Sequence, residues 1–154
     1  MEIITFVTME ERLENRVSMD HREIHISLIK KMLKINVDVV RSGLAMLEEY
    51  EKDESLPYML SLGLKLVHYG TEPQIIETIL LNTALVNNID LLTGLLIMDG
   101  VLSIQKMYLP EITKELLMSY FRHDTKSKIE KELEDLDINS RSVLTNKEVN
   151  ELVK

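Results

Sequence analysis

The segment from residue 94 to residue 105, with the sequence GLLIMDGVLSIQ, constrains the fold of this chain more than any other. Apolar side chains in and just before it are too dense for a helix with one wet face: Leu92, Leu95, Leu96, Met98, Leu102 and Ile104. The pair Asp99-Gly100 would suit a turn between strands, but no neighbouring stretch alternates apolar and polar residues with a period of two. We therefore predict a buried helix in which Gly94 and Gly100 let a neighbouring backbone approach closely.

Length and composition favour an all-α fold. The 154 residues fit one domain with a sizeable core, and five Gly and three Pro are too few for a fold rich in β-turns. Leu, Ile, Met, Glu and Lys dominate, as in helical proteins. We expect a single compact bundle of about six to eight helices, given ordinary helix lengths. Aromatic residues make up only 5% and Trp is absent, so the core must be aliphatic.

Charge and cysteine content exclude several classes of function. The chain has no cysteine, so it can form neither a disulfide framework nor a thiolate metal site, which agrees with a cytoplasmic location. The formal net charge of -8 disfavours binding to nucleic acid or to anionic lipid. The first residues lack the pattern of a signal peptide. The longest uncharged run, residues 78–89, is far shorter than the roughly 20 residues of a membrane span. We expect a soluble protein that does not span the membrane.

Apolar spacing and cap residues predict the helices. We expect one long or kinked helix over residues 21–52, and we expect close packing at Gly43 within it. A helix over residues 57–69 should have Pro57 in its first turn and end at Gly70. Further signals are a capping box at residues 71–74, a cap at Asp90 for a helix to about Met107, and a helix over residues 109–121 with Ile112, Leu116, Leu117 and Tyr120 inward.

The two ends of the chain differ from its middle. Residues 1–7 are apolar and β-branched and are predicted to form a short arm, and a capping box follows at residues 8–11. We divide the chain into a helical domain with this arm, residues 1–122, and a charged helical C-terminal extension, residues 123–154. The extension carries one apolar stripe (Ile129, Leu133 and Leu136), so we expect it to pack loosely or to extend from the body.

A search for catalytic, cofactor and metal motifs identifies no such site. His21 and His25 are spaced to face one metal ion from a helix, but Arg22 stands where the zinc-protease pattern has Glu, which favours an exposed polar face. His68 and His123 are single histidines near helix ends, where a charged ring would stabilise the helix dipole. No phosphate-binding glycine loop or nucleophile elbow is present in the sequence. We therefore expect an interaction module without catalytic residues, cofactor or metal, and not an enzyme.

Two stretches resemble the cytoplasmic part of MotA-type proteins, the proton-channel subunit of the bacterial flagellar stator. The first comprises RSGLAMLEE at residues 41–49 and, at residues 57–73, PYMLSLGLKLVHYGTEP, where the family typically shows REGLLALEE and PFLKRGLQLVVDGTDP; residues 75–80 resemble its IREIL helix. The second is DGVLSIQ at residues 99–105, followed by Pro110 and later by SYF, where the family shows EGVLAIQ and NPRLIEEKLLSFL. The resemblance covers roughly residues 27–122, with matching order and spacing.

The resemblance implies a stator cytoplasmic domain without its channel. In MotA-type proteins two membrane helices precede the first stretch, and two more lie between the IREIL helix and EGVLAIQ. Residues 1–26 and 81–97 take these places here, and neither segment has the length and apolarity of a membrane span. Proton conduction is therefore not implied for this chain.

The resemblance also suggests a binding surface. In the family a basic residue of PFLKRG and nearby acidic residues contact the rotor switch protein electrostatically. The matching basic position here is residue 61 or 62, which is uncharged, and His68-Tyr69 stand where an acidic residue is usual. Lys65 and Glu72 keep their charge. The candidate partner-binding residues are thus Lys65, His68, Tyr69 and Glu72.

These observations lead to two hypotheses. The first is a soluble MotA-like accessory protein of the flagellar motor that binds a rotor switch or stator component. Such a protein would work in the cytoplasm, near the motor at the inner face of the membrane. We expect a monomer or a weak homodimer, because the family's ring contacts rely on membrane spans. The alternative is a helical regulatory or adaptor protein derived from a stator domain, with a partner unrelated to motility.

Overall fold

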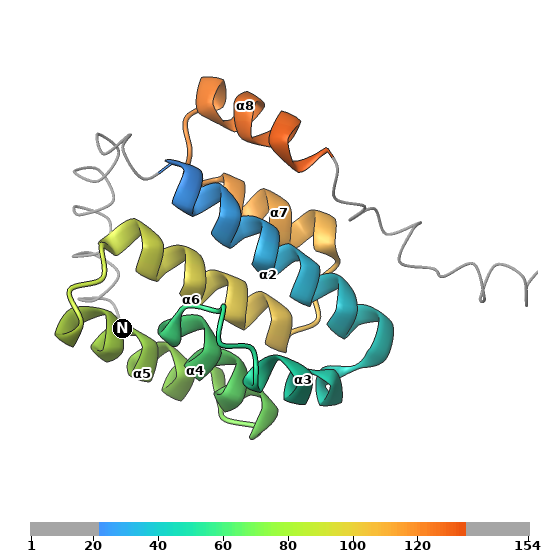
Figure 1. Cartoon of the computed structure of the whole chain (residues 1–154), viewed down its shortest axis with the longest axis vertical. Coiled ribbons are helices and arrows are strands. Elements are labelled where there is room, and N and C mark those ends of the chain that lie inside the picture. Colours follow the sequence, from blue (N-terminus) through green and yellow to red (C-terminus); the bar gives the residue numbers. More distant parts are fainter. Residues whose placement is uncertain (1–21, 135–154) are drawn as a thin grey trace, which may run out of the picture.

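The computed structural model describes residues 22–134, and every regular element in this range is helical (Figure 1). In chain order the elements are α2 (Arg22–Ser42), the 3-10 helix η2 (Leu44–Met46), α3 (Leu47–Glu51), α4 (Tyr58–His68), α5 (Pro73–Val86), α6 (Leu91–Gln105), α7 (Pro110–Met118) and α8 (His123–Leu133). This confirms the predicted all-α class. The N-terminal arm, the capping box at residues 8–11, His21 and the charged tail after residue 134 lie outside the described residues.

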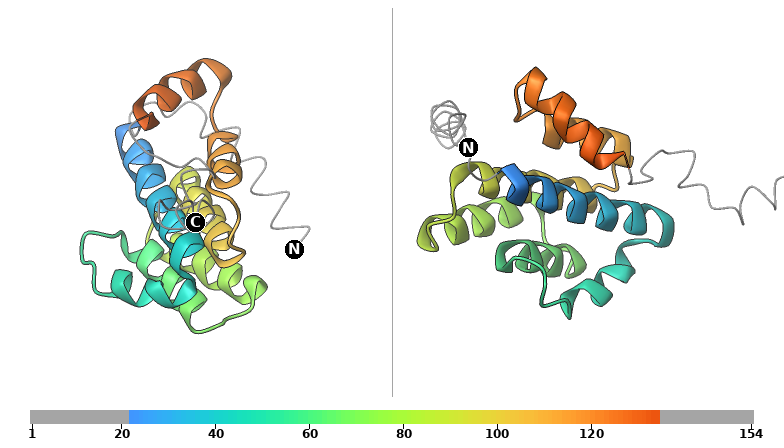
Figure 2. Two further views of the ribbon diagram at one scale, coloured as in Figure 1. Left: turned by 90° about the vertical axis from the view of Figure 1, so that its right-hand side faces the viewer. Right: turned by 45° about the horizontal axis from the view of Figure 1, so that its top comes forward.

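The predicted buried helix is α6, and it lies at the centre of the bundle. It packs against α2 and α7 on one side and against α4 and α5 on the other (Figures 1 and 2). Its fully buried side chains join those of α2, α4 and α5 in one aliphatic core, which includes Ile29, Leu33, Leu60, Leu64, Leu80, Leu96 and Val101. Between residues 22 and 134, no helix combines the length and the apolarity that a membrane crossing requires.

Glycines set how closely the central helices pack. A Cβ atom at Gly100 would collide with the Met32 side chain of α2, whose Cε would lie 3.2 Å away. A Cβ atom at Gly63 in α4 would lie 2.6 Å from Cγ2 of Val101 in α6. The prediction that a neighbouring backbone approaches Gly94 and Gly100 is therefore wrong: at Gly100 it is the Met32 side chain that lies close, and a Cβ atom at Gly94 would meet only Ala84 Cβ at 3.4 Å and Met59 Cε at 4.0 Å.

The chain breaks at Gly43, where we predicted a helix interior with close packing. That prediction is wrong, because α2 ends at Ser42 and Gly43 has a φ of 87°, a conformation that side chains other than glycine rarely adopt. No described atom lies within 4 Å of a Cβ placed there. The positive φ turns the chain into η2 and α3, which pack against α4.

Three helices end at a residue with positive φ, followed by a backbone hydrogen bond that reaches back five residues. After α4, the N–H of Thr71 donates to the carbonyl of Leu66 (3.1 Å) and that of Gly70 to Val67 (3.0 Å), with Gly70 at φ 74°, so the predicted stop is confirmed. The end of α6 repeats both bonds around Met107, and the end of α5 repeats the longer one around Asn88, where the N–H of Ile89 donates to Ala84 (3.0 Å); Asn88 and Met107 both have a φ of 52°. The capping box predicted at residues 71–74 does not form, because the N-cap of α5 is Glu72 and makes no side-chain cap bond.

The last two helices differ from the prediction. In α7 the buried face is Pro110, Thr113 and Leu117, whereas Ile112 is 54% and Leu116 is 37% exposed, so our inward assignment of those two was wrong. The predicted inward face of this helix is thus offset by about one residue from the face that is buried in the structure. His123 begins α8 rather than ending the preceding helix.

The first part of the C-terminal extension does not pack loosely. Ile129 and Leu133 of α8 are buried in the core, and α8 contacts α2. The apolar stripe recognised in the sequence therefore serves as a packing face.

Candidate functional site

The four predicted partner-binding residues gather where α4 ends and α5 begins. Lys65 lies in the last turn of α4, His68 is its final residue, Tyr69 follows directly and Glu72 precedes α5. Lys65, Tyr69 and Glu72 are exposed, and the Tyr69 side chain is 66% exposed. We call these four residues the α4 end surface.

The backbone under this surface is fixed from two directions. The hydrogen bonds around Gly70 close the end of α4, as described above. The Gln105 side chain at the end of α6 donates from Nε2 to the carbonyl oxygen of Thr71, at 2.7 Å. The turn that carries Tyr69 and Glu72 is thus tied to the central helix and not only to its own neighbours.

Side chains on the α4 end surface organise one another. The Lys65 ammonium lies 5.7 Å from the centre of the Tyr69 ring, within the range of a cation–π contact. The His68 and Tyr69 rings stack with centroids 6.4 Å apart. His68 Nδ1 lies 2.7 Å from Glu51 Oε1 in α3, so a protonated His68 forms an ion pair with that carboxylate. The result is an exposed tyrosine flanked by a cation and by a histidine that α3 holds in place.

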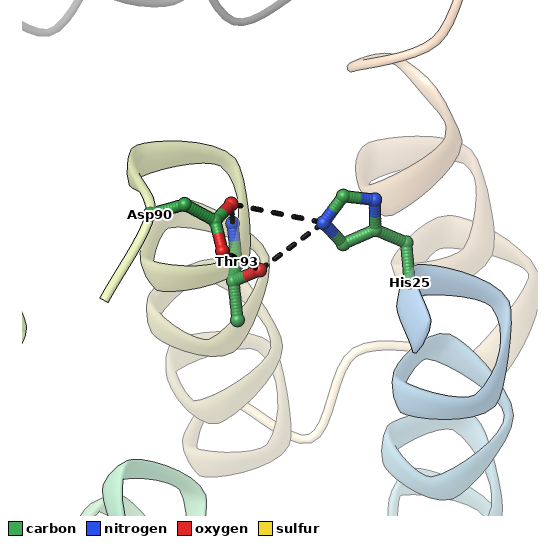
Figure 3. Close-up of polar contacts among 3 residues, drawn as sticks. All are labelled: His25, Asp90 and Thr93. Carbon is green, nitrogen blue, oxygen red and sulfur yellow. Dashed lines mark hydrogen bonds and ion pairs between the residues drawn. The ribbon is translucent and has the colours of Figure 1, made fainter. Parts of the chain in front are cut away.

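A second polar cluster joins α2 to α6 (Figure 3). His25 in the first turns of α2 is buried, and its Nε2 lies 3.1 Å from Oγ1 of Thr93 and 3.8 Å from Oδ2 of Asp90. The Thr93 hydroxyl donates to Oδ1 of Asp90 (2.6 Å), and the Thr93 N–H donates to Oδ2 (3.0 Å). Asp90 therefore caps α6 as predicted, whereas the exposed polar face expected for His25 is wrong.

The geometry of this cluster argues for a structural role. A nucleophilic triad needs the hydroxyl to donate to one imidazole nitrogen and the carboxylate to accept from the other. Here the Thr93 hydroxyl donates to Asp90, so Thr93 accepts from His25, and one nitrogen, Nε2, faces both partners. Within residues 22–134, no group of three or more His, Asp or Glu side chains is placed to hold a metal ion. The cluster thus links the start of α2 to the start of α6.

An apolar pocket of about 200 Å³ opens near the start of α6, at the end of the bundle that holds the His25 cluster. It lies between α5 and α6, and Met59 of α4 forms part of its wall. Every described residue that lines it is apolar, and Leu85 at its edge is 69% exposed. An uncharged, apolar group is therefore the only kind of occupant that the pocket suits.

Sequence reasoning missed His25 and the pocket for different reasons. His25 lies three and four residues before Leu28 and Ile29, so it falls on the buried stripe of α2, a signal that the i, i+4 metal spacing with His21 obscured. The pocket needs α4, α5 and α6 to be placed in three dimensions. Comparison of the chain with protein families, with curated proteins and with solved structures gives no significant match.

Proposed function

We propose that this chain is a MotA-like helical interaction protein of the bacterial flagellar motor, which binds a rotor switch or stator component through the α4 end surface and conducts no protons. One observation carries the proposal: the two stretches that resemble the stator domain pack on one another. Gly63 of the first stretch lies directly against Val101 of the second, and Gln105 of the second holds the carbonyl of Thr71 in the first at 2.7 Å.

The position of the two replaced membrane segments supports the same proposal. Residues 1–26 and 81–97 stand where MotA-type proteins carry membrane helices. The beginning of α2 and the α5–α6 turn lie at the same end of the bundle (Figure 1), and the 3.1 Å contact between His25 and Thr93 joins them. In a stator-like domain without its two pairs of membrane helices, such a contact would join the two chain segments that replace them. The α4 end surface lies at the other end of α5.

The α4 end surface has the chemistry of a protein-binding site. An exposed tyrosine gives a large contact area and a hydroxyl with few rotatable bonds, and tyrosines are among the residues that carry most binding energy in interfaces. Lys65 and Glu72 add charges of opposite sign around Tyr69, which fix orientation more than affinity.

The test is binding of the purified full chain to the rotor switch protein and to stator subunits of its own organism, measured by biolayer interferometry. Tyr69→Ala should weaken binding by about tenfold or more, as expected for a central tyrosine. Tyr58→Ala is the matched control, because Tyr58 is 68% exposed at the opposite end of α4 and should change affinity less than about twofold. Absence of binding by the folded chain to either class of component would refute the proposal.

A second candidate function is a regulatory or adaptor protein with a partner unrelated to motility. The observation that favours it is the character of the α4 end surface, where His68 and Tyr69 replace an acidic residue and His68 is already held by Glu51. The surface therefore carries two adjacent aromatic rings at a place where the family has a charge. A purified partner from outside the motor whose affinity falls with Tyr69→Ala but not with Tyr58→Ala would support this function.

A further inference from the structure

The apolar pocket between α5 and α6 is smaller than the usual site for a drug-sized ligand. Sites for drug-sized molecules measure about 300–1,000 Å³, whereas a cavity of about 150 Å³ accepts a benzene molecule. The pocket, of about 200 Å³, therefore fits one aromatic ring or a pair of short aliphatic side chains. Its wall includes Met59, Leu81, Leu91, Leu95 and Met98, and none of these can pair with a charge.

The position of the pocket indicates which part of the chain can reach it. Thr93, which contacts His25 at 3.1 Å, directly precedes Gly94 in the pocket wall, so the first turns of α2 lie beside the pocket end of α6. Arg22, the first described residue, therefore lies at this end of the bundle. By contrast, α8 ends at the opposite end of the bundle, so the last described residues lie far from the pocket (Figures 1 and 2).

The sequence before Arg22 holds one apolar block. Residues 3–7 read IITFV, whereas residues 8–21 are rich in Glu and Arg and cannot fill an apolar pocket without an unpaired charge. Fourteen residues separate the block from α2. Extended, they span up to about 46 Å. Half of this extended length would already match the whole of α6, whose 15 residues span about 22 Å, so the linker is long enough to reach the pocket.

We propose that residues 3–7 of the same chain dock in this pocket, with the Phe6 ring as the anchor. A single aromatic ring matches the volume, and the rest of the block covers the exposed edge at Leu85. Because the segment is tethered to α2, its effective concentration is in the millimolar range, which lets a small apolar contact be occupied without high intrinsic affinity. The docking is independent of the function proposed above.

Methionine methyl groups provide the test, because Met59 and Met98 line the pocket. In the full chain labelled with ¹³C-methyl methionine, Phe6→Ala should shift the Met59 and Met98 resonances by removing the ring. Met118, which is buried in α7, serves as the internal reference and should not move. A synthetic peptide of residues 1–12 added to the Phe6→Ala chain should restore the original shifts.

Two exposed positions supply a matched pair that does not depend on the N-terminal sequence. Leu85 lines the pocket and is 69% exposed, whereas its neighbour Val86 is 79% exposed and does not line it. Leu85→Asp should move the two methyl resonances toward those of Phe6→Ala, and Val86→Asp should not. Unchanged Met59 and Met98 resonances in Phe6→Ala would overturn the proposal. Shifts that depend on protein concentration would overturn it too, because they would place the segment of a second copy in the pocket.

Discussion

Substitution of Gly63 by alanine should destabilise the protein even though alanine is the better helix former. In the interior of α4, the change gains about 1 kcal/mol of helix propensity. The new methyl group would lie 2.6, 3.1 and 3.3 Å from three atoms of Val101, which is fully buried and branched at Cβ, so it cannot swing aside. Overpacking of this kind costs about 1–3 kcal/mol. Because the close contacts are several, we expect the upper part of that range and a net loss of about 1–2 kcal/mol.

Gly94→Ala is the matched control in the same bundle. Gly94 also lies in a helix, but a methyl group there would meet only the Ala84 Cβ at 3.4 Å and the Met59 Cε at 4.0 Å, which are ordinary contacts. The control should therefore keep the propensity gain and raise stability by up to about 1 kcal/mol. Urea unfolding followed by far-UV circular dichroism measures both changes, since the chain is helical and lacks Trp.

A double-mutant cycle isolates the contact. Val101→Ala removes the two methyl groups that the new Cβ meets, so Gly63→Ala should stabilise the Val101→Ala chain instead of destabilising it. The coupling free energy between the two changes should then be about 1 kcal/mol or more. A Gly63→Ala chain that is as stable as the unmodified chain, or more so, would refute the predicted clash with Val101, and so would additivity of the two changes.

Three further predictions concern single side chains. Burial and the hydrogen bond to Asp38 raise the pKa of Tyr50, so the phenol stabilises the fold below pH 10, where the unfolded phenol also keeps its proton. Stability should fall as pH rises above about 10, and Tyr50→Phe should flatten that fall in urea titrations at several pH values. Asp90→Ala should cost about 1 kcal/mol through loss of the α6 cap, and Asp90→Asn less, as thermal unfolding can measure. Met107→Gly should raise the free energy of unfolding by about 1 kcal/mol, because Met107 holds a φ of 52°; an unchanged midpoint in urea would contradict this.

Local signals in the sequence predicted most helices and several of their ends. The helix break at Gly43 and the buried face of α7 could not be predicted from them. The density of apolar residues around Gly100 was enough to place α6 in the core, and Asp90 and Gly70 marked helix ends that the structure confirms. The break at Gly43 was not predictable from spacing, because the apolar stripe of α2 continues past it in phase and only the φ of 87° ends the helix. The exposed face of α7 was missed because Pro110 and Thr113, which are buried, do not count as apolar period markers.

The candidate sites also differ in how far the sequence could predict them. The residues of the α4 end surface are close in sequence, so one helix end and one turn bring them together whatever the remaining fold. The pocket and the His25 cluster need residues from α2, α4, α5 and α6 to meet, and no single stretch of sequence contains that information.

The two proposed contacts lie at opposite ends of α5, and this separation makes them independently testable. Glu72 precedes its first residue and Leu85 lies in its last turn, so the 14 residues of α5 place about 20 Å of helix between the two sites. Changes that far apart with no shared partner normally add. Phe6→Ala should therefore leave the affinity for a partner unchanged, and Tyr69→Ala should leave the Met59 and Met98 resonances unchanged. Coupling between the two would mean that α5 moves as a rigid body when the pocket empties, with Gln105 and its bond to the Thr71 carbonyl as the contact that would have to break.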